Sequence, residues 1–208
     1  MKKILILLFL FLLVPVVRAE EEDLAPNAKS AIMIEASTGE ILFQKNKDEK
    51  LAPASMTKMM SMLLIMEEIE NGNLKWDEMI TASERAASMG GSQIFLKVGE
   101  KMSVTDMVKG ISIASGNDAT VAMAERISGS EESFVKKMND RAKELGLKNT
   151  NFINATGLTA DNHYSSANDM VLIARELVKH EKILEFTGTY EDYLRKNFKI
   201  YINARRLC

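Results

Sequence analysis

The chain has 208 residues, and its 27 basic and 29 acidic side chains leave a formal net charge of −2 at pH 7. Without a basic excess, nucleic acid is not an expected partner. The sequence has one cysteine, Cys208, so no disulfide can form within the chain. Its two histidines, His163 and His180, are too few for a metal cluster and belong to no metal-binding pattern. We therefore expect no metal or cofactor, and chemistry carried by hydroxyls, amines and carboxylates.

The first nineteen residues have the three-part pattern of an export signal. Lys2 and Lys3 come first, fourteen almost purely apolar residues follow at 4–17, and a small residue, Ala19, ends the segment. Since a helix needs roughly 20 apolar residues to span a bilayer, we expect cleavage after Ala19, with an uncleaved membrane anchor as the alternative. The exported chain, 20–208, has 24 basic and 29 acidic side chains. It is expected to work outside the cytoplasm, at the cell envelope, without a transmembrane helix.

Residues 30–44 are predicted to form an antiparallel β-hairpin, because two apolar runs, AIMIEA and ILFQ, flank a turn that contains Gly39. Over 53–69 the apolar residues change to helical spacing, and Asn71-Gly72 stops the helix. Helical periodicity predicts further helices over 83–87, 104–114, 119–128, 132–145 and 167–180. Without repeats or a linker, the exported chain is expected to be one compact unit, strands first and helices after.

The segment LAPASMTKMM at 51–60 has Ser55 and Lys58 three residues apart at the start of the first predicted helix. This spacing brings both side chains to one face of a helix, a single turn apart. A serine hydroxyl becomes a good nucleophile when a neighbouring base takes its proton, and an amine can serve if burial lowers its pKa. The pattern alone is weak, because it recurs at Ser133 and Lys136. We attribute that second copy to a solvent-exposed helix face.

A second polar group, Ser115-Gly116-Asn117, lies in the predicted break between two helices. Residues two apart in non-helical backbone can point the same way. The Ser115 hydroxyl can then pass a proton, and the Asn117 carboxamide can hold a substrate amide by one donor and one acceptor. A plain capped turn is the alternative, since Ser, Gly and Asn are ordinary turn residues. The same spacing also recurs at Ser166 and Asn168.

Together the two groups resemble the first two of three signatures of penicillin-binding proteins and serine β-lactamases. From about residue 26 to 194, the sequence resembles low-molecular-mass penicillin-binding proteins of the D-alanyl-D-alanine carboxypeptidase type. The stretches that carry this likeness are GGSQIFLKVGE at 90–100, ISIASGNDATVAMAE at 111–125 and NFINATGLTADNHYSSANDMVLIARE at 151–176. The resemblance implies an α/β (mixed α+β) fold of the β-lactamase/transpeptidase-like class, with an N-terminal β-hairpin and a helical subdomain.

The resemblance also implies a chemistry for four residues. Ser55 would attack the carbonyl between the two terminal D-alanines of a peptidoglycan stem peptide and form an acyl-enzyme, with Lys58 as general base. Ser115 would relay a proton to the leaving D-alanine, and Asn117 would hold the substrate backbone. Water would then release the shortened peptide. β-Lactam antibiotics would acylate the same Ser55, because their strained amide imitates the bond that is cleaved.

The family's third signature, Lys-Thr-Gly, does not occur in the sequence. The resemblance assigns to it a strand that binds the substrate carboxylate and supplies one of two oxyanion-hole N–H groups, a donor whose loss typically costs about 100- to 1,000-fold in rate. From about residue 196 the sequence no longer resembles the family and shows no strand pattern. This change favours a premature end or a shifted reading frame over a true short variant. We expect the catalytic domain at 20–208 to lack the strands that complete its sheet, so that the 30–44 hairpin keeps an exposed edge.

Three functions are open at this point. The first is an active serine carboxypeptidase, and the second is an inactive, truncated remnant that at most binds stem peptide or β-lactam. The third, a class A β-lactamase, would usually have Ser-Asp-Asn where this chain has Ser115-Gly116-Asn117. Gly91-Ser92-Gln93 either lines the rim of the cleft or forms an ordinary loop. His163, which the resemblance puts near the cleft, is expected to make structural hydrogen bonds.

Overall fold

The computed structural model describes residues 23–201 of the chain. The predicted export signal at 1–19 and Cys208 lie outside these residues. The elements in chain order are β1 (Ala31–Ile34), β2 (Ile41–Lys45), the 3₁₀ turn η2 (Ala54–Thr57), α2 (Lys58–Glu70), β3 (Met79–Thr81), α3 (Glu84–Ala87), β4 (Lys101–Ser103), α4 (Val104–Ala114), α5 (Asn117–Ser128), α6 (Glu131–Glu144), α7 (Ala167–Leu177), α8 (Lys182–Thr187), β5 (Glu191–Leu194) and β6 (Phe198–Tyr201).

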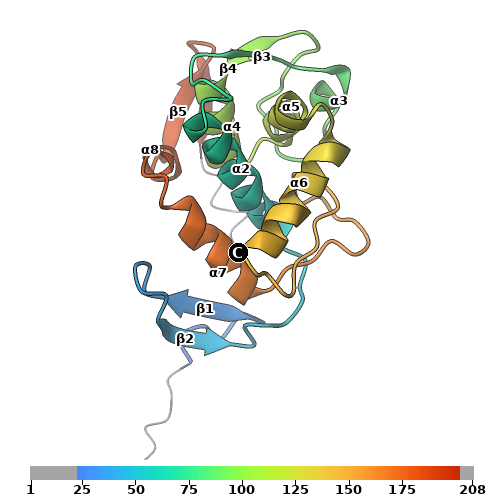
Figure 1. Cartoon of the computed structure of the whole chain (residues 1–208). Helices are drawn as coiled ribbons and strands as arrows, with labels where there is room; N and C mark the ends of the chain where they lie inside the picture. The colour runs from blue at the N-terminus through green and yellow to red at the C-terminus, as the bar shows by residue number, and fades with distance from the viewer. Residues whose placement is uncertain (1–22, 202–208) are drawn as a thin grey trace, which may run out of the picture.

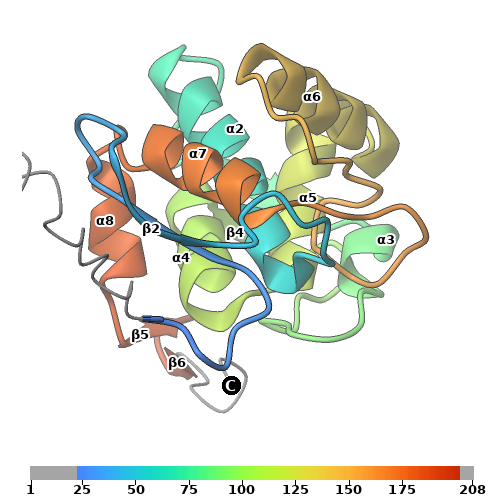
Figure 2. The same ribbon diagram turned by 90° about the horizontal axis from the view of Figure 1, so that it is seen from below.

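The helix α2 runs through the middle of the molecule and contacts α4, α5, α6 and α7 (Figure 1). The β1–β2 hairpin lies against α7 at one end, and the view from below shows the hairpin crossing that helix (Figure 2). The short β3–β4 pair lies at the opposite end (Figure 1). The predicted order of strands first and helices after therefore holds for β1 to α2, while short strands also occur later in the chain.

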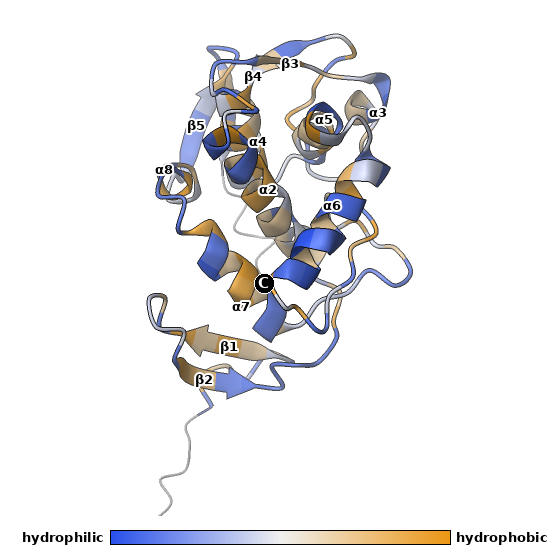
Figure 3. Ribbon diagram, viewed as in Figure 1, coloured by the Kyte–Doolittle hydropathy of each residue, from blue (hydrophilic) through white to orange (hydrophobic). Residues whose placement is uncertain are grey.

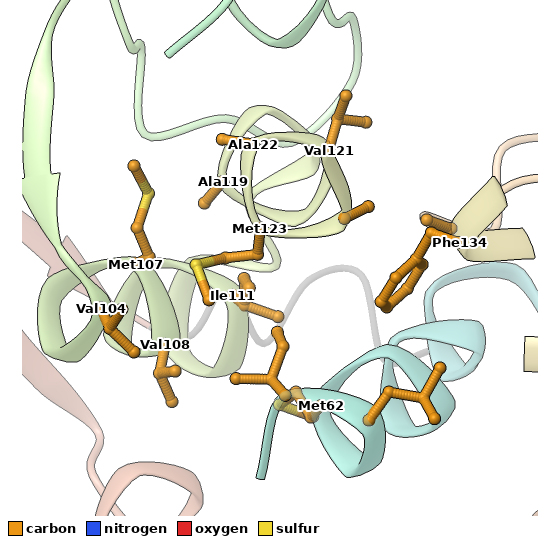
Figure 4. Packing of buried hydrophobic residues seen from close by; sticks show 14 of the residues in the cluster. Met62, Val104, Met107, Val108, Ile111, Ala119, Val121, Ala122, Met123 and Phe134 are labelled. Carbon is orange, nitrogen blue, oxygen red and sulfur yellow. The ribbon is translucent and has the colours of Figure 1, made fainter. Parts of the chain in front are cut away.

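The core is built on α2, in which residues 60–66 are all buried. A helix that is covered on every side is apolar around its whole circumference rather than along one stripe. Met62 of α2 lies together with Ile111 of α4, Met123 of α5 and Phe134 of α6 (Figure 4). By contrast, α6 is mostly hydrophilic and buries only one side (Figure 3). This central packing fixes the start of α2, where the candidate site begins.

Serine side chains begin four of the helices. Ser83, Ser103, Ser130 and Ser166 each accept a hydrogen bond from the backbone N–H three residues on, at the starts of α3, α4, α6 and α7. A side-chain oxygen at this position satisfies an N–H that the helix leaves without a partner. The five helices predicted after residue 80 are all present, with α5 beginning at Asn117 rather than 119 and α7 ending at 177 rather than 180.

The predicted hairpin at 30–44 is present, with β1 and β2 paired antiparallel. The sequence pattern does not predict the antiparallel pairs β3–β4 and β5–β6. Within residues 23–201 each sheet has two strands. Met33, Ile41 and Leu42 are between 44% and 53% exposed, so the hairpin keeps uncovered apolar surface.

The expectation of no strand after about residue 196 is wrong for the described part of the chain. Phe198–Tyr201 forms β6 and pairs with β5 through a turn in which Arg195 and Lys196 both have positive φ. Ile200 is buried and β6 packs on α4, while the alternate residue Lys199 is exposed, which is the two-residue period of a half-buried strand. Between residues 23 and 201 no helix combines the length and the apolar character needed to cross a membrane.

Candidate active site

The structure brings the side chains of Ser55 and Lys58 together. Ser55 lies in the 3₁₀ turn η2, and Lys58 is the first residue of α2, one turn later. The Lys58 amine donates to Ser55 Oγ at 3.5 Å, a long hydrogen bond of the kind seen in catalytic pairs without substrate. Pro53, which is buried, precedes the turn and fixes its entry. The predicted contact is therefore present, with the serine exposed and the lysine buried.

The environment of Lys58 favours a neutral amine. Lys58 is only 3% exposed, and this burial lowers the pKa of its amine from 10.5 to about 8. The amine also donates a 2.7 Å hydrogen bond to the carbonyl oxygen of Thr156, which lies in the loop between α6 and α7. The amine thus contacts both the Thr156 carbonyl and the Ser55 hydroxyl, and it can take the serine proton only in its neutral form.

The loop that holds Lys58, residues 154–158, is shaped by its own side chains. Asn154 Oδ1 accepts hydrogen bonds from the backbone N–H of Thr156 and of Gly157 and from the Thr156 hydroxyl. Gly157 has φ +85°, and a Cβ there would lie 1.8 Å from the carbonyl oxygen of Ala54, the residue before Ser55. The loop therefore contacts Lys58 and the residue that precedes Ser55. The sequence motifs do not identify it, although Asn-x-Thr-Gly is typical of a turn.

Ser115 and Asn117 occupy the junction between α4 and α5, as predicted. Ser115 ends α4 in a left-handed conformation, with φ 56° and ψ 35°. Its Oγ is buried and has no hydrogen-bond partner in the described structure. A left-handed non-glycine residue and an unpaired buried hydroxyl each cost about 1–2 kcal/mol. Two such costs at one residue are typical of a functional site.

Asn117 ties this junction to the segment 90–92. Its backbone N–H donates to the carbonyl of Ser92, and its side-chain Nδ2 donates to the carbonyl of Gly90, both at 2.7 Å. A Cβ on Gly91 would lie 2.8 Å from Asn117 Nδ2 and 3.6 Å from the side chain of Leu158. The segment therefore lies between Asn117 and the loop that holds Lys58. This segment, residues 90–96, is called the wall below, and a shared site for the two predicted motifs stays a prediction.

Two charged side chains hold the next residues of this wall. Asp118 is 1% exposed, and its carboxylate accepts hydrogen bonds from the backbone N–H groups of Ile94 and Leu96. Arg195, from the β5–β6 turn, donates to the carbonyl oxygens of Ile94 and Phe95. Phe95 has φ 59° and is exposed, an unusual conformation for a bulky residue. Sequence reasoning missed the roles of Asp118 and Arg195, because these roles depend on contacts between distant segments.

The other candidates have structural roles. Ser133 and Lys136 are exposed, and Lys136 pairs with Asp140, so the second copy of the serine–lysine pattern lies on a solvated face as predicted. His163 accepts the backbone N–H of Ile153 at Nδ1 and lies 2.9 Å from the Thr57 hydroxyl at Nε2. Nε2 therefore carries the ring proton, and burial lowers the pKa of this imidazole, which keeps it neutral. Its expected structural hydrogen bonding is confirmed.

Three further observations concern residues named in the sequence analysis. Ser166 Oγ caps α7 by accepting the N–H of Asp169, which explains the second Ser-x-Asn spacing as a helix start. No group of three His, Cys, Asp or Glu side chains within residues 23–201 is arranged to hold a metal ion. His180 lies 2.6 Å from Glu70, away from the site residues above.

Comparison with known proteins relates this site to one family. The family model described as D-alanyl-D-alanine carboxypeptidase matches residues 16–207, which includes the segment after about residue 196 that we expected to lie outside the resemblance. The D-alanyl-D-alanine carboxypeptidase DacF of Bacillus subtilis is 66% identical over 175 residues, which are 84% of this chain and 45% of DacF. The chain thus spans about half the length of the curated relatives it matches.

Solved structures with a similar fold come from the same group of proteins. The D-alanyl-D-alanine carboxypeptidase DacD from Francisella tularensis gives a TM-score of 0.80 at 38% identity, covering 88% of this chain and 45% of that one. Penicillin-binding protein D2 from Listeria monocytogenes, solved in an ampicillin-bound form, gives 0.77 at 28% identity, covering 88% of this chain and 75% of that one. These neighbours confirm the expected α/β fold class.

Proposed function

Because the chain belongs to the D-alanyl-D-alanine carboxypeptidase family, we propose that it removes the terminal D-alanine from peptidoglycan stem peptides through an acyl-enzyme on Ser55. The observation that carries the proposal is the contact between Ser55 Oγ and the buried Lys58 amine. With a pKa of about 8, about a tenth of this amine is neutral at pH 7, against roughly one part in 3,000 at its ordinary value of 10.5. Burial thus supplies a base that can act near neutral pH.

In the acylation step, the neutral Lys58 amine takes the proton of Ser55 as Oγ attacks the carbonyl carbon between the two D-alanines. A C–O bond forms, and the tetrahedral intermediate collapses by breaking the C–N bond. The departing amine takes a proton that the Ser115 hydroxyl passes on from the Lys58 ammonium, which returns Lys58 to its neutral form. Water then attacks the ester, Lys58 takes a proton from that water, and Ser55 is released with its own proton restored. The buried Ser115 hydroxyl supports this relay, since it has no competing partner within residues 23–201.

Asn117 has a more limited role in substrate binding than its carboxamide allows in principle. Its Nδ2 already donates to the carbonyl oxygen of Gly90. The side-chain oxygen is therefore the atom assigned to a backbone N–H of the substrate. The same hydrogen bond fixes the orientation of the carboxamide, which lowers the entropy lost on binding.

β-Lactam antibiotics are the proposed inhibitors, because attack by Ser55 on their strained amide opens the ring and leaves an ester on the same oxygen. The ampicillin-bound form of the Listeria monocytogenes protein supports this assignment. The proposal also includes export of the chain to the cell envelope after removal of residues 1–19, which lie outside the described structure. Export is supported by the three-part pattern of that segment.

Release of D-alanine from a diacylated tripeptide that ends in D-Ala-D-Ala tests the proposed function. Wild type and Ser133→Ala are expected to release D-alanine at equal rates, and Ser55→Ala is expected to release none. Ser133→Ala is the matched control, because Ser133 begins the second, exposed copy of the pattern. Release by Ser55→Ala at the wild-type rate overturns the assignment. Acylation of wild type without release of D-alanine refutes the proposed hydrolysis and leaves only the nucleophilic role of Ser55.

A further inference from the structure

Side chains from two different helices hold Ala155, one through its backbone N–H and one through its carbonyl oxygen. Its backbone N–H donates to Glu131 Oε1 of α6 at 3.2 Å, and its carbonyl oxygen accepts a 2.7 Å hydrogen bond from Ser61 Oγ of α2. Ala155 and Ser61 are fully buried, and Glu131 is 8% exposed. Hydrogen bonds in such a dry setting are strong, and a partner removed there leaves a costly unpaired group.

The next residue along this loop is the one that holds the lysine. Thr156 gives its carbonyl oxygen to the Lys58 amine, directly after the carbonyl of Ala155 that Ser61 holds. Lys58 and Ser61 are three residues apart on α2, so they share one face of the helix. This face therefore holds two consecutive carbonyl oxygens of one loop. Neither Ser61 nor Glu131 belongs to a signature that the sequence analysis identified.

Resting on the proposed function, we propose that Ser61 and Glu131 are positioning residues, which fix the 154–158 loop so that the Thr156 carbonyl holds the Lys58 amine against Ser55. Arg85 of α3 completes this support, because its guanidinium pairs with the second oxygen of Glu131 at 2.9 Å. The loop is thus fixed from α2, α3 and α6 at once. These residues act through the loop, and they touch neither substrate nor the reacting atoms.

Loosening the loop has a defined effect on Lys58. The amine is buried partly by the loop, so a displaced loop admits water, and the pKa of the amine rises from about 8 toward 10.5. A rise of one unit lowers the neutral fraction at pH 7 about tenfold. Two titratable groups contact the loop and the turn next to Lys58: Glu131 accepts from Ala155, and His163, which is neutral, contacts Thr57. Because burial alone shifts the pKa of Lys58, removing the charge of Glu131 while keeping its hydrogen bond is expected to leave that pKa unchanged.

The experiment compares variants that separate hydrogen bonding from charge. Ser61→Ala removes the donor to Ala155, and its control Ser112→Ala removes a serine that bonds only within its own helix. Glu131→Ala and Glu131→Gln remove the same charge, but the Gln variant keeps an acceptor for the Ala155 N–H. Urea unfolding first identifies the variants that remain folded.

Two readouts are taken for each folded variant. The pKa of Lys58 is measured by carbon NMR of the lysine Cε atoms, assigned with Lys58→Arg, and the acylation rate is measured from pH 6 to 10 with a fluorescent penicillin. Ser61→Ala and Glu131→Ala are expected to raise both midpoints by about one unit and to slow acylation at pH 7 about tenfold. Ser112→Ala and Glu131→Gln are expected to keep the wild-type midpoint.

The outcomes separate this inference from the proposed function. A wild-type value of the Lys58 pKa in folded Ser61→Ala and Glu131→Ala overturns the positioning role. A raised pKa in these variants, together with a wild-type chain that is never acylated, supports the positioning role and refutes the proposed function. Equal shifts in Glu131→Ala and Glu131→Gln refute the role of Glu131, since charge alone then explains the change.

Discussion

Gly157→Ala tests the packing of the lysine-holding loop against the serine turn. In the structure, a Cβ at this position would lie 1.8 Å from the carbonyl oxygen of Ala54 and 2.9 Å from the Thr57 hydroxyl. Ordinary contact begins at 3.4 Å, so the loop and the turn must separate by about 1.6 Å. The alanine also keeps φ +85°, where a Cβ is unfavourable by about 1 kcal/mol. Together with overpacking of about 1–3 kcal/mol, the expected loss in the free energy of unfolding is about 2–4 kcal/mol.

The same displacement is expected to slow acylation. Thr156 precedes Gly157, so moving the loop shifts the carbonyl that holds Lys58, and a misplacement of about 1 Å in a catalytic group can cost about 100-fold in rate. The free energy of unfolding is measured in urea, and acylation is measured with a fluorescent penicillin. Gly146→Ala is the matched control, because Gly146 has φ +72° and nothing within 4 Å of a Cβ. Its expected cost is the backbone contribution of about 1 kcal/mol, with an unchanged acylation rate.

A Gly157→Ala variant that is as stable as Gly146→Ala and is acylated at the wild-type rate would refute this reasoning. In that case Gly157 and Ala54 would not be in contact, and the loop would not be the element that sets the position of Lys58.

Three further predictions concern the base, the proton relay and the wall. The acylation rate of wild type is expected to rise with pH through a midpoint of about 8, because only neutral Lys58 can take a proton. A rate that does not change from pH 6 to 9 would exclude Lys58 as the base. Ser115→Ala is expected to slow acylation about 100-fold in the same assay. The free energy of unfolding is expected not to fall, since the substitution removes a buried hydroxyl that has no partner within residues 23–201. An unchanged acylation rate would exclude the proton relay. Asp118→Ala is expected to lower the free energy of unfolding in urea by about 2–5 kcal/mol, because the buried N–H groups of Ile94, Leu96 and Ala119 lose their acceptor. The exposed control Asp161→Ala is expected to stay within about 0.5 kcal/mol, and equal values for the two variants would contradict the wall contacts.

The parts of the fold that depend on local pattern are predictable from the sequence. The 30–44 hairpin follows from two apolar runs around a glycine turn, and the helices follow from their apolar period and their serine caps. The serine–lysine contact is predictable for the same reason, because three residues along a helix is a local distance. The contact is present in the structure, and the catalytic roles remain a prediction.

The parts that depend on contacts between distant segments are not predictable from local pattern. β3 and β4 have three residues each and lie about twenty residues apart in sequence, so neither gives a strand signal of its own. The role of Asn154 and Gly157 becomes visible only when their loop lies against Ala54. Ser115 is left-handed without being a glycine, a conformation that sequence does not indicate.

The segment after residue 196 shows where the sequence prediction fails. We expect no strand there, because the residues show no strand pattern, yet Phe198–Tyr201 forms β6 and the family model extends to residue 207. The strand has only four residues, and it is fixed by its pairing with β5 and its packing on α4. Arg195 in the preceding turn contacts the carbonyl oxygens of Ile94 and Phe95.

The most direct test of the central claim is the site of covalent labelling by penicillin. The folded chain is exposed to penicillin, and mass spectrometry of its peptides locates the added mass, with Ser55→Ala and Lys58→Met as comparison variants. We predict the full penicilloyl mass on Ser55 in wild type, none in Ser55→Ala, and strongly slowed labelling in Lys58→Met. Label on any other residue, or label on Ser55 at an undiminished rate in Lys58→Met, would contradict an account in which a buried amine makes this serine reactive.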